Sequence, residues 1–266
     1  MENVVPKLTI ITVTLNAVET IKGAISSTVG QTFKNVEYIV IDGGSTDGTV
    51  ELLEKYRQQN KLRYVSEPDN GIYYAMNKAI LIATGEWLYF MGSDDVFVDG
   101  GVLERVFAQD NGTADVLYGN VKFLHSGAIY DGPFDHEKIS QKNICHQALF
   151  VKKTVFDRVG LFNTKYIMSA DFDFNIRWMG LNIPSKYLEE TIVVFNEKGL
   201  SGTIWDKEFH FDLDNILIAN NIISRRSFTA LKAKYESILH SERYKLGNFL
   251  LTPVSLIKNK WQHRKK

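Results

Sequence analysis

The sequence contains little that would indicate a secreted or membrane-spanning protein. It has one cysteine, Cys145, among 266 residues, which excludes an intramolecular disulfide and suits a reducing compartment. No segment approaches the roughly 20 apolar residues that span a bilayer, because the longest late candidate, residues 248–257, is short and contains Pro253. The first seven residues also lack the basic stretch and apolar run of a secretion signal. These absences favour a cytoplasmic protein.

The net charge is also zero, but the positive and negative residues are unevenly distributed along the chain. Residues 221–266 carry 11 basic and 2 acidic residues (net +9), and residues 1–220 carry 20 and 29 (net −9). The basic residues are interleaved with apolar ones such as Phe228 and Leu231, which is typical of an amphipathic helix on an anionic membrane. A helix packed on the acidic body explains the pattern equally well. Nucleic-acid binding is less well supported, because no recognition motif accompanies the charge.

The first half of the chain alternates β-branched runs with helical patterns. Strands are expected at residues 8–14, 36–41, 62–65 and 86–91, and helices at about 19–29, from 49, and at 71–83. Strand–helix units in this order predict an α/β protein with a mostly parallel sheet. Ligands of such sheets bind beyond the carboxyl ends of the strands.

The pattern changes after residue 115. Strands are expected at residues 116–124, 128–130, 148–151 and 186–196, and short helices at 154–159 and 170–179. Residues from about 212 onward are expected to be helical, with an interruption near Pro253. We therefore expect one domain at residues 1–211, with halves that meet at about residue 115, followed by a helical basic tail at residues 212–266.

Two acidic groups follow predicted buried strands and are therefore expected at the same edge of the sheet. Asp94 and Asp95 repel each other unless a positive charge lies between them, and a divalent cation with oxygen ligands is the obvious source. A simple strand-end turn is the alternative. Asp42 precedes two glycines, which let the backbone approach a ligand closely. Ser45 and Asp47 are expected to cap the next helix.

Seven segments of the first half are similar to a known family. They are residues 10–16 (IITVTLN), 31–33 (QTF), 38–49 (YIVIDGGSTDGT), 67–72 (EPDNGI), 75–78 (AMNK), 83–87 (ATGEW) and 93–95 (SDD). Together they resemble family 2 of the inverting glycosyltransferases, which have the GT-A fold. The resemblance implies a metal-dependent hexosyl- or N-acetylhexosaminyltransferase of bacterial polysaccharide assembly. It also implies a nucleotide-sugar donor, with UDP expected first.

The resemblance implies a role for each matched residue. Asp42 corresponds to the aspartate that binds the nucleobase, and Val13 and Thr14 correspond to part of the same pocket. Asp94 and Asp95 match the D-x-D element, in which the first carboxylate faces the ribose. The last carboxylate, Asp95, binds Mn²⁺ or Mg²⁺, which bridges the donor diphosphate.

The second half resembles the family more loosely. The segment ADFDFNIR is similar to the helix that carries the general base, which implies that Asp171 is the catalytic base. The family has Glu where this chain has Ala170, so any contact of that Glu is absent or supplied elsewhere. His146 belongs to a segment (HQALF) that lines the acceptor side in relatives. It is either a sugar contact or a structural residue.

Three neighbouring residues are not assigned a catalytic role. Asp173 is two residues from Asp171 and is expected on another side of the helix. Arg177 is expected to brace that helix or a loop. Tyr74 stands where relatives often have Asp.

Two other classes of protein remain as alternatives. A nucleotidyltransferase shares the fold and the carboxylates, but it should carry a Gly-rich basic loop where this chain has LNAVE at residues 15–19. A non-catalytic sugar- or partner-binding module would not need Asp94, Asp95 and Asp171 together. The favoured partners are a nucleotide-sugar donor and a glycan or lipid-linked acceptor. The basic tail adds peripheral contact with the inner face of the cell membrane as an alternative to a purely cytoplasmic location.

Overall fold

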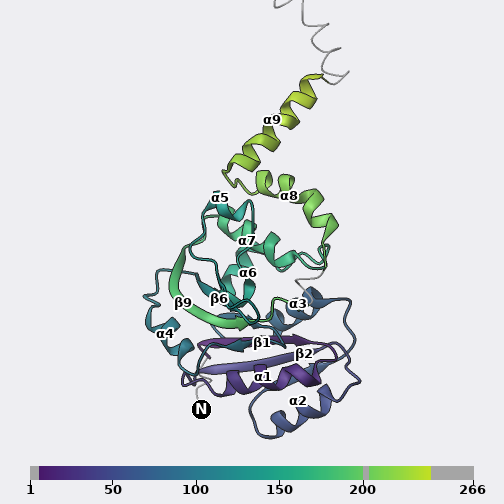
Figure 1. Ribbon diagram of the computed structural model, residues 1–266, viewed down its shortest axis with the longest axis vertical. Helices are drawn as coiled ribbons and strands as arrows, with labels where there is room; N and C mark the ends of the chain where they lie inside the picture. The colour runs from purple at the N-terminus through teal and green to yellow at the C-terminus, as the bar shows by residue number, and fades with distance from the viewer. Residues whose placement is uncertain (1–5, 200–203, 241–266) are drawn as a thin grey trace, which may run out of the picture.

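The computed structural model describes residues 6–199 and 204–240, in which the strands form one twisted sheet (Figure 1). The strand order is β3 (Arg63–Ser66), β2 (Val36–Asp42), β1 (Leu8–Thr14), β4 (Trp87–Met91), β8 (Leu149–Lys152), β6 (Val116–Phe123), β9 (Ser185–Phe195) and β5 (Val96–Phe97), with β7 (Ile129–Tyr130) beside β6. Helices cover both faces of this sheet.

The strands of the first half are all parallel. Strand β1 pairs in parallel with β2 and with β4, and β2 pairs in parallel with β3. Successive residues of a strand face opposite sides, so Ile10 packs with α1 (Val18–Val29) and Ile11 packs with α3 (Ile72–Ile82). Helix α2 (Thr49–Gln58) connects β2 to β3. The prediction of an α/β protein with a mostly parallel sheet is confirmed for this half.

The second half continues the same sheet with mixed strand directions. Strand β8 lies antiparallel between β4 and β6, while β6 and β9 are parallel. Helices α6 (Lys153–Val159) and α7 (Ala170–Gly180) pack on the α3 side, where Phe156 and Phe174 stack with ring centroids 4.7 Å apart. One sheet therefore carries residues of both halves to a common edge.

The predicted strands and helices of residues 8–196 are present, with their ends shifted by at most one residue. Four short elements were not predicted: β5, α4 (Val102–Ala108), α5 (His136–Ile139) and the 3-10 turn η1 (His146–Ala148). They are too short to show a clear hydrophobic period. The late helical region begins before residue 212, with α8 (Lys207–Ala219), because the Asp206 side chain accepts a hydrogen bond of 3.2 Å from the Phe209 backbone N–H.

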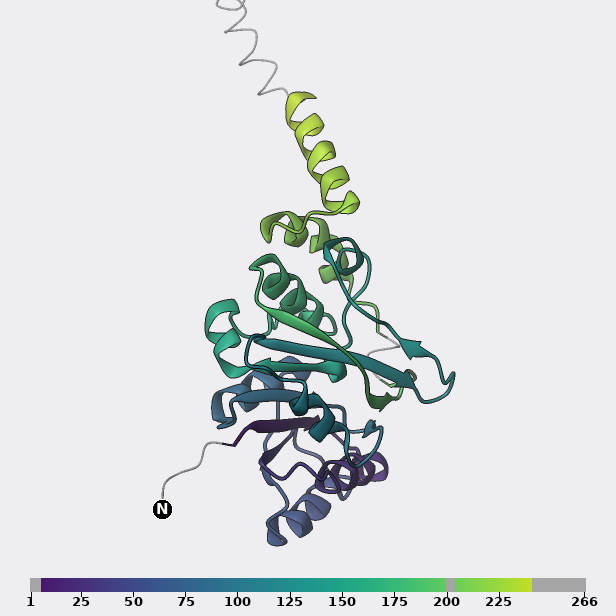
Figure 2. The same cartoon turned by 90° about the vertical axis from the view of Figure 1, so that its left-hand side faces the viewer.

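Helix α9 (Arg225–His240) projects away from the body in both views (Figures 1 and 2). Residues 241–266 and the predicted interruption at Pro253 lie outside the described residues. Within the described ranges, no helix has the length and apolar character needed to cross a membrane.

Candidate active site

A cleft of about 610 Å³ opens at the carboxyl ends of the parallel strands. Its walls include Thr14 at the end of β1, Gly43 after β2, Asp94 after β4 and Asn196 after β9. The position is the one at which open α/β sheets bind ligands, and the volume lies in the range of about 300–1,000 Å³ common for small-molecule sites. Both acidic groups predicted from the sequence lie at this edge.

The adjacent carboxylates Asp94 and Asp95 are held by residues from the second half. The Asn196 side-chain amide donates to Oδ2 of Asp94 (2.8 Å), and its backbone N–H donates to Oδ1 of Asp95 (2.8 Å). Gln147 donates to the other oxygen of Asp95 (3.0 Å). Asp94 lines the cleft, whereas Asp95 is only 1% exposed behind it. Burial raises the pKa of Asp95 to about 6, and the charge of Asp94 contributes to the increase.

The acidic pair fits a divalent cation with few protein ligands. A Cβ atom at Gly199 would lie 2.9 Å from Oδ2 of Asp94, so the backbone there comes unusually close to the carboxylate. Within residues 6–199 and 204–240, no group of three or more His, Cys, Asp or Glu side chains could hold a metal ion. Mg²⁺ does not need a larger cluster, because proteins commonly bind it through one or two carboxylates, with phosphate and water as the other ligands.

Thr14 and Asp42, which the resemblance assigns to a nucleobase pocket, end the neighbouring strands β1 and β2, but only Thr14 lines the cleft. Val13 and Thr14 line the cleft, and the hydroxyl of Thr14 is buried with no hydrogen-bond partner among the described residues. Such an unsatisfied polar group is rare in a folded protein and is consistent with a ligand contact. Asp42 is fully buried and accepts hydrogen bonds from the N–H of Gly44 (3.0 Å) and the hydroxyl of Ser66 (2.7 Å). Asp42 thus fixes the shape of the loop beside the pocket.

The prediction that Ser45 caps the following helix is wrong. Its hydroxyl donates to Asp42 and accepts from the N–H of Asn16 (2.7 Å), which joins the loops after β2 and β1. Asp47 accepts from the N–H of Thr49 (3.0 Å) in the first turn of α2, but also from the N–H of Val18 (3.0 Å) at the start of α1. The loop residues bind the neighbouring loop because the parallel strands place their ends side by side.

The predicted base Asp171 lies in the first turn of α7 within a network of three donors. The Tyr73 hydroxyl is 2.8 Å from Oδ1, and the Asn143 amide is 2.8 Å from Oδ2. His146 Nδ1 is 3.1 Å from the same Oδ2. Burial and the charge of Asp171 hold the pKa of Tyr73 well above its usual range, so its hydroxyl stays protonated. His146 lines the cleft, and Asp171 lies directly behind it.

The neighbours of Asp171 have the structural roles that the sequence predicts. Asp173 is 5% exposed and forms an ion pair with Arg177 (2.8 Å). Arg177 also donates to the Leu161 carbonyl (2.8 Å), which braces the preceding loop. Ala170 is fully buried in the apolar core.

Sequence reasoning missed four polar side chains that position the predicted carboxylates: Tyr73, Asn143, Gln147 and Asn196. Gln147 follows His146 in a segment that was already singled out. Asn196 ends the last predicted strand, as Asp42 ends an earlier one. A polar residue at the end of a strand is therefore the sequence feature from which Asn196 could have been predicted. No comparable signal marks Tyr73 or Asn143, because their partner lies 98 and 28 residues away along the chain.

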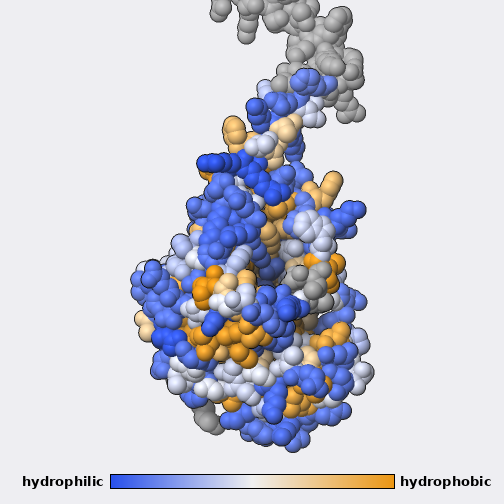
Figure 3. Space-filling model, viewed as in Figure 1, coloured by the Kyte–Doolittle hydropathy of each residue, from blue (hydrophilic) through white to orange (hydrophobic). Residues whose placement is uncertain are grey.

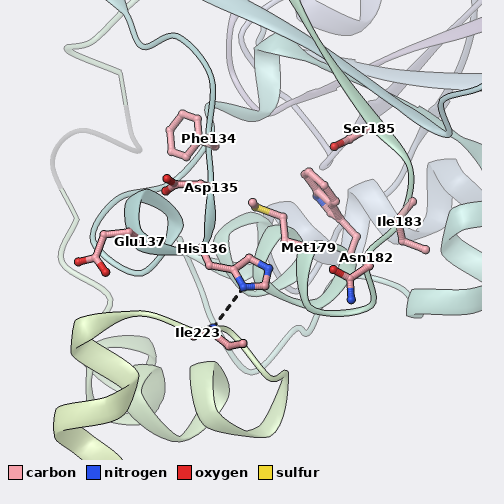
Figure 4. Close-up of a pocket in the computed structure, with 10 residues that line it drawn as sticks. Phe134, Asp135, His136, Glu137, Met179, Asn182, Ile183, Ser185 and Ile223 are labelled. Atoms are coloured by element: carbon pink, nitrogen blue, oxygen red, sulfur yellow. Dashed lines mark hydrogen bonds between the residues drawn. The ribbon is translucent and has the colours of Figure 1, made fainter.

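A second hollow of about 580 Å³ lies away from these residues (Figure 4). Phe134, His136 and Met179 line it, and the backbone N–H of Ile223 donates to Nδ1 of His136 (3.2 Å). None of the predicted site residues lines this hollow. It lies where the α8–α9 connection meets α5.

The parallel sheet, the acidic pair at its edge and the cleft are features of the GT-A fold. Residues 9–146 match the model of the family described as glycosyl transferase family 2. The chain belongs to this family and is a glycosyltransferase. It is 35% identical over 211 residues to a PGL/p-HBAD biosynthesis glycosyltransferase of Mycobacterium tuberculosis, covering 77% of this chain and 82% of the relative.

Solved structures support the fold. S. aureus TarS 1-349 in complex with UDP-GlcNAc superposes with a TM-score of 0.70 at 19% identity, covering 82% of this chain and 67% of that chain. The mannosyltransferase PcManGT of Pyrobaculum calidifontis, in complex with GDP-Man and Mn²⁺, gives a TM-score of 0.60 at 15% identity, covering 99% and 89%. These similarities confirm the GT-A fold predicted from the sequence.

Proposed function

We propose that this enzyme is an inverting glycosyltransferase of bacterial surface polysaccharide or glycolipid assembly. It transfers a hexosyl or N-acetylhexosaminyl group from a nucleotide-diphosphate donor, with a UDP-sugar as the first candidate, to a hydroxyl of a glycan or lipid-linked acceptor. The names of the relatives support the pathway, and the complex of TarS supports the donor class. The observation that carries the proposal is the cleft itself, which Asp94 and the Asp171–His146 pair approach from different elements.

The residues on the two walls of the cleft have different roles in the reaction. Val13, Thr14 and the loop shaped by Asp42 hold the nucleobase and ribose, and Asp94 faces the ribose. The Asp171–His146 pair on the other wall accepts the proton of the attacking hydroxyl, as a positioned base does. Attack on one face of the anomeric carbon and departure from the other invert its configuration without a covalent enzyme intermediate.

Asp95, with Asp94, would hold Mn²⁺ or Mg²⁺. When bound, the cation stabilises the negative charge that develops on the leaving diphosphate. The raised pKa of Asp95 fits this role, because a buried carboxylate beside a second one favours a positive neighbour.

A panel of UDP-, GDP- and dTDP-sugars tests the function directly. With Mn²⁺ present, the enzyme should release the nucleotide diphosphate from at least one donor and should be stabilised thermally by that nucleotide through mass action. Release of pyrophosphate from a nucleoside triphosphate and a sugar phosphate would instead identify a nucleotidyltransferase. Nucleotide binding without turnover on any acceptor or water would favour the binding-module alternative.

We also propose that α9 and the rest of the basic tail form a second unit beyond the catalytic domain, which contacts anionic membranes. Phe228, Leu231 and Tyr235 are 70%, 50% and 61% exposed and recur at helical spacing. Figure 3 shows hydrophobic and hydrophilic side chains next to each other along this part of the surface. Lys232 and Lys234 lie in the same helix, and the sequence beyond it remains strongly basic. Such a helix binds membranes through apolar burial and charge together.

A further inference from the structure

The two members of the Asp171–His146 pair have unequal access to the cleft. His146 is among the residues that line it, and Asp171 is not. The side chain of His146 is 17% exposed, against 11% for Asp171. His146 therefore meets the cleft directly, and Asp171 contacts it through the hydrogen bond to Nδ1.

The hydrogen bonds of the pair are also unequal. Both oxygens of Asp171 already accept hydrogen bonds, from Tyr73 on one side and from Asn143 and His146 on the other. In contrast, only one of the two ring nitrogens of His146, Nδ1, is hydrogen-bonded. Nε2 has no partner among residues 6–199 and 204–240. An incoming hydroxyl can therefore donate to Nε2 at the cleft, whereas the one remaining acceptor site of Asp171, on Oδ1 beside the Tyr73 hydroxyl, belongs to a residue that does not line the cleft.

The chemistry of the two groups fixes where the proton lies. An ionised carboxylate only accepts hydrogen bonds, so Nδ1 of the neutral imidazole carries the proton in this contact. Nε2 is then the unprotonated nitrogen, with its lone pair available. A base oriented by a third group is a common arrangement in enzymes that activate a hydroxyl.

We infer that His146, through Nε2, is the group that takes the proton from the acceptor hydroxyl, and that Asp171 is a positioning residue that holds the imidazole. This inference rests on the proposed function and names the proton acceptor within it. As the acceptor oxygen bonds to the anomeric carbon, its proton moves to Nε2. The bond from that carbon to the phosphate oxygen breaks, and its electron pair leaves with the nucleotide diphosphate. The imidazolium is stabilised by Asp171 and later releases its proton to water in the cleft.

Chemical rescue distinguishes a proton acceptor from a structural histidine. Nucleotide release from the donor that wild type hydrolyses fastest, among UDP-glucose, UDP-N-acetylglucosamine and GDP-mannose, is measured with water as the acceptor. We expect kcat of His146→Ala to fall by about 10²–10⁴-fold, with donor affinity and melting temperature close to wild type. Added imidazole should restore part of the rate in His146→Ala but not in Asp171→Asn. His210→Gln, on α8 and outside the cleft lining, is the matched control and should keep the wild-type rate.

Rates of His146→Ala within about tenfold of wild type would overturn the inference while leaving the proposed function intact. So would a large loss that imidazole does not restore. Failure of wild type itself to release nucleotide from any donor would instead remove the proposed function. In that case the ¹⁵N NMR signals of the histidine rings, assigned by comparison with His146→Gln, still test the geometry. They should place the proton of neutral His146 on Nδ1 in wild type, and a proton on Nε2 would overturn the inference.

Discussion

The two walls of the cleft are built from different kinds of structure. The proposed nucleotide wall consists of the ends of neighbouring parallel strands and short loops that bind one another, as Ser45 does with Asn16. The proposed acceptor wall contains Tyr73 from α3, Asn143 and His146 from the segment before β8, and Asp171 from α7. Strand pairing fixes the first wall, whereas packing between separate elements fixes the second. Mutations on the two walls should therefore differ in their effects on donor binding, turnover and stability.

The largest effect is expected on the acceptor wall, from Asp171→Asn. The amide cannot serve as a base or stabilise an imidazolium, so kcat should fall by about 10²–10⁴-fold, or about 3–5 kcal/mol of barrier. The NH₂ group of the new amide would face one of the neighbouring groups that now donate to Asp171, and this donor–donor contact should cost about 1–3 kcal/mol in stability. The measurement is kcat beside donor Kd and melting temperature.

Asp173→Asn is the matched control for this prediction. Asp173 lies in the same helix, but its partner is Arg177, and it does not line the cleft. This variant should lose stability and keep most of its turnover. A folded Asp171→Asn enzyme with turnover within about tenfold of wild type would show that Asp171 neither serves as the base nor positions it, and Asp173 would become the next candidate.

On the nucleotide wall, Asp95→Ala should impair binding rather than turnover alone. UDP affinity in the presence of Mn²⁺ should fall by at least about tenfold, or about 1.4 kcal/mol, and a chelator should then make no difference. Calorimetric titration with and without chelator measures both. Asp99→Ala is the control, because Asp99 pairs with Arg105 on the surface. Equal wild-type affinity in both conditions would exclude a metal-dependent nucleotide site.

Outside both walls, the proposed membrane contact predicts retention on acidic vesicles at low salt. Each basic residue near such a surface is worth about 1 kcal/mol, so removal of residues beyond Ser224 should release the protein. Phe228→Asp should weaken sedimentation with the vesicles several-fold, since it places a negative charge on the exposed apolar side of α9. Thr229→Asp adds the same charge one residue further round the helix and should weaken it less. Equal sedimentation of the full-length and truncated chains would contradict the contact.

The smallest effect is expected from Ser66→Ala beside the nucleobase pocket. The substitution removes one of several hydrogen bonds to Asp42 and should cost about 1–2 kcal/mol of stability. Donor affinity should weaken slightly and kcat should stay near wild type. Urea unfolding and a donor titration measure the two effects. A fall in kcat comparable to that of Asp171→Asn would mean that the walls are not separable.

Prediction from the sequence was most successful where local patterns carry the information. The runs that form β1 and β4 are short, apolar and β-branched or aromatic, and buried parallel strands require that composition. Asp42 at the end of β2 and Asp94 after β4 were predicted to share one edge, and they do, because β1 pairs in parallel with both strands. The capping role of Ser45 was predicted wrongly because a serine before a helix has the same local pattern whether it binds that helix or a neighbouring loop.

The sequence by itself determined the parallel sheet, the edge at which ligands bind and the family, because strand period, strand-end residues and motif order are local properties of the chain. Only the tertiary structure decided which side chains surround Asp171, since Tyr73 lies 98 residues away from it. It likewise placed His146 in front of Asp171 at the cleft and Asp95 behind Asp94. Contacts between distant residues depend on how helices pack on the sheet, and that packing is a property of the whole chain.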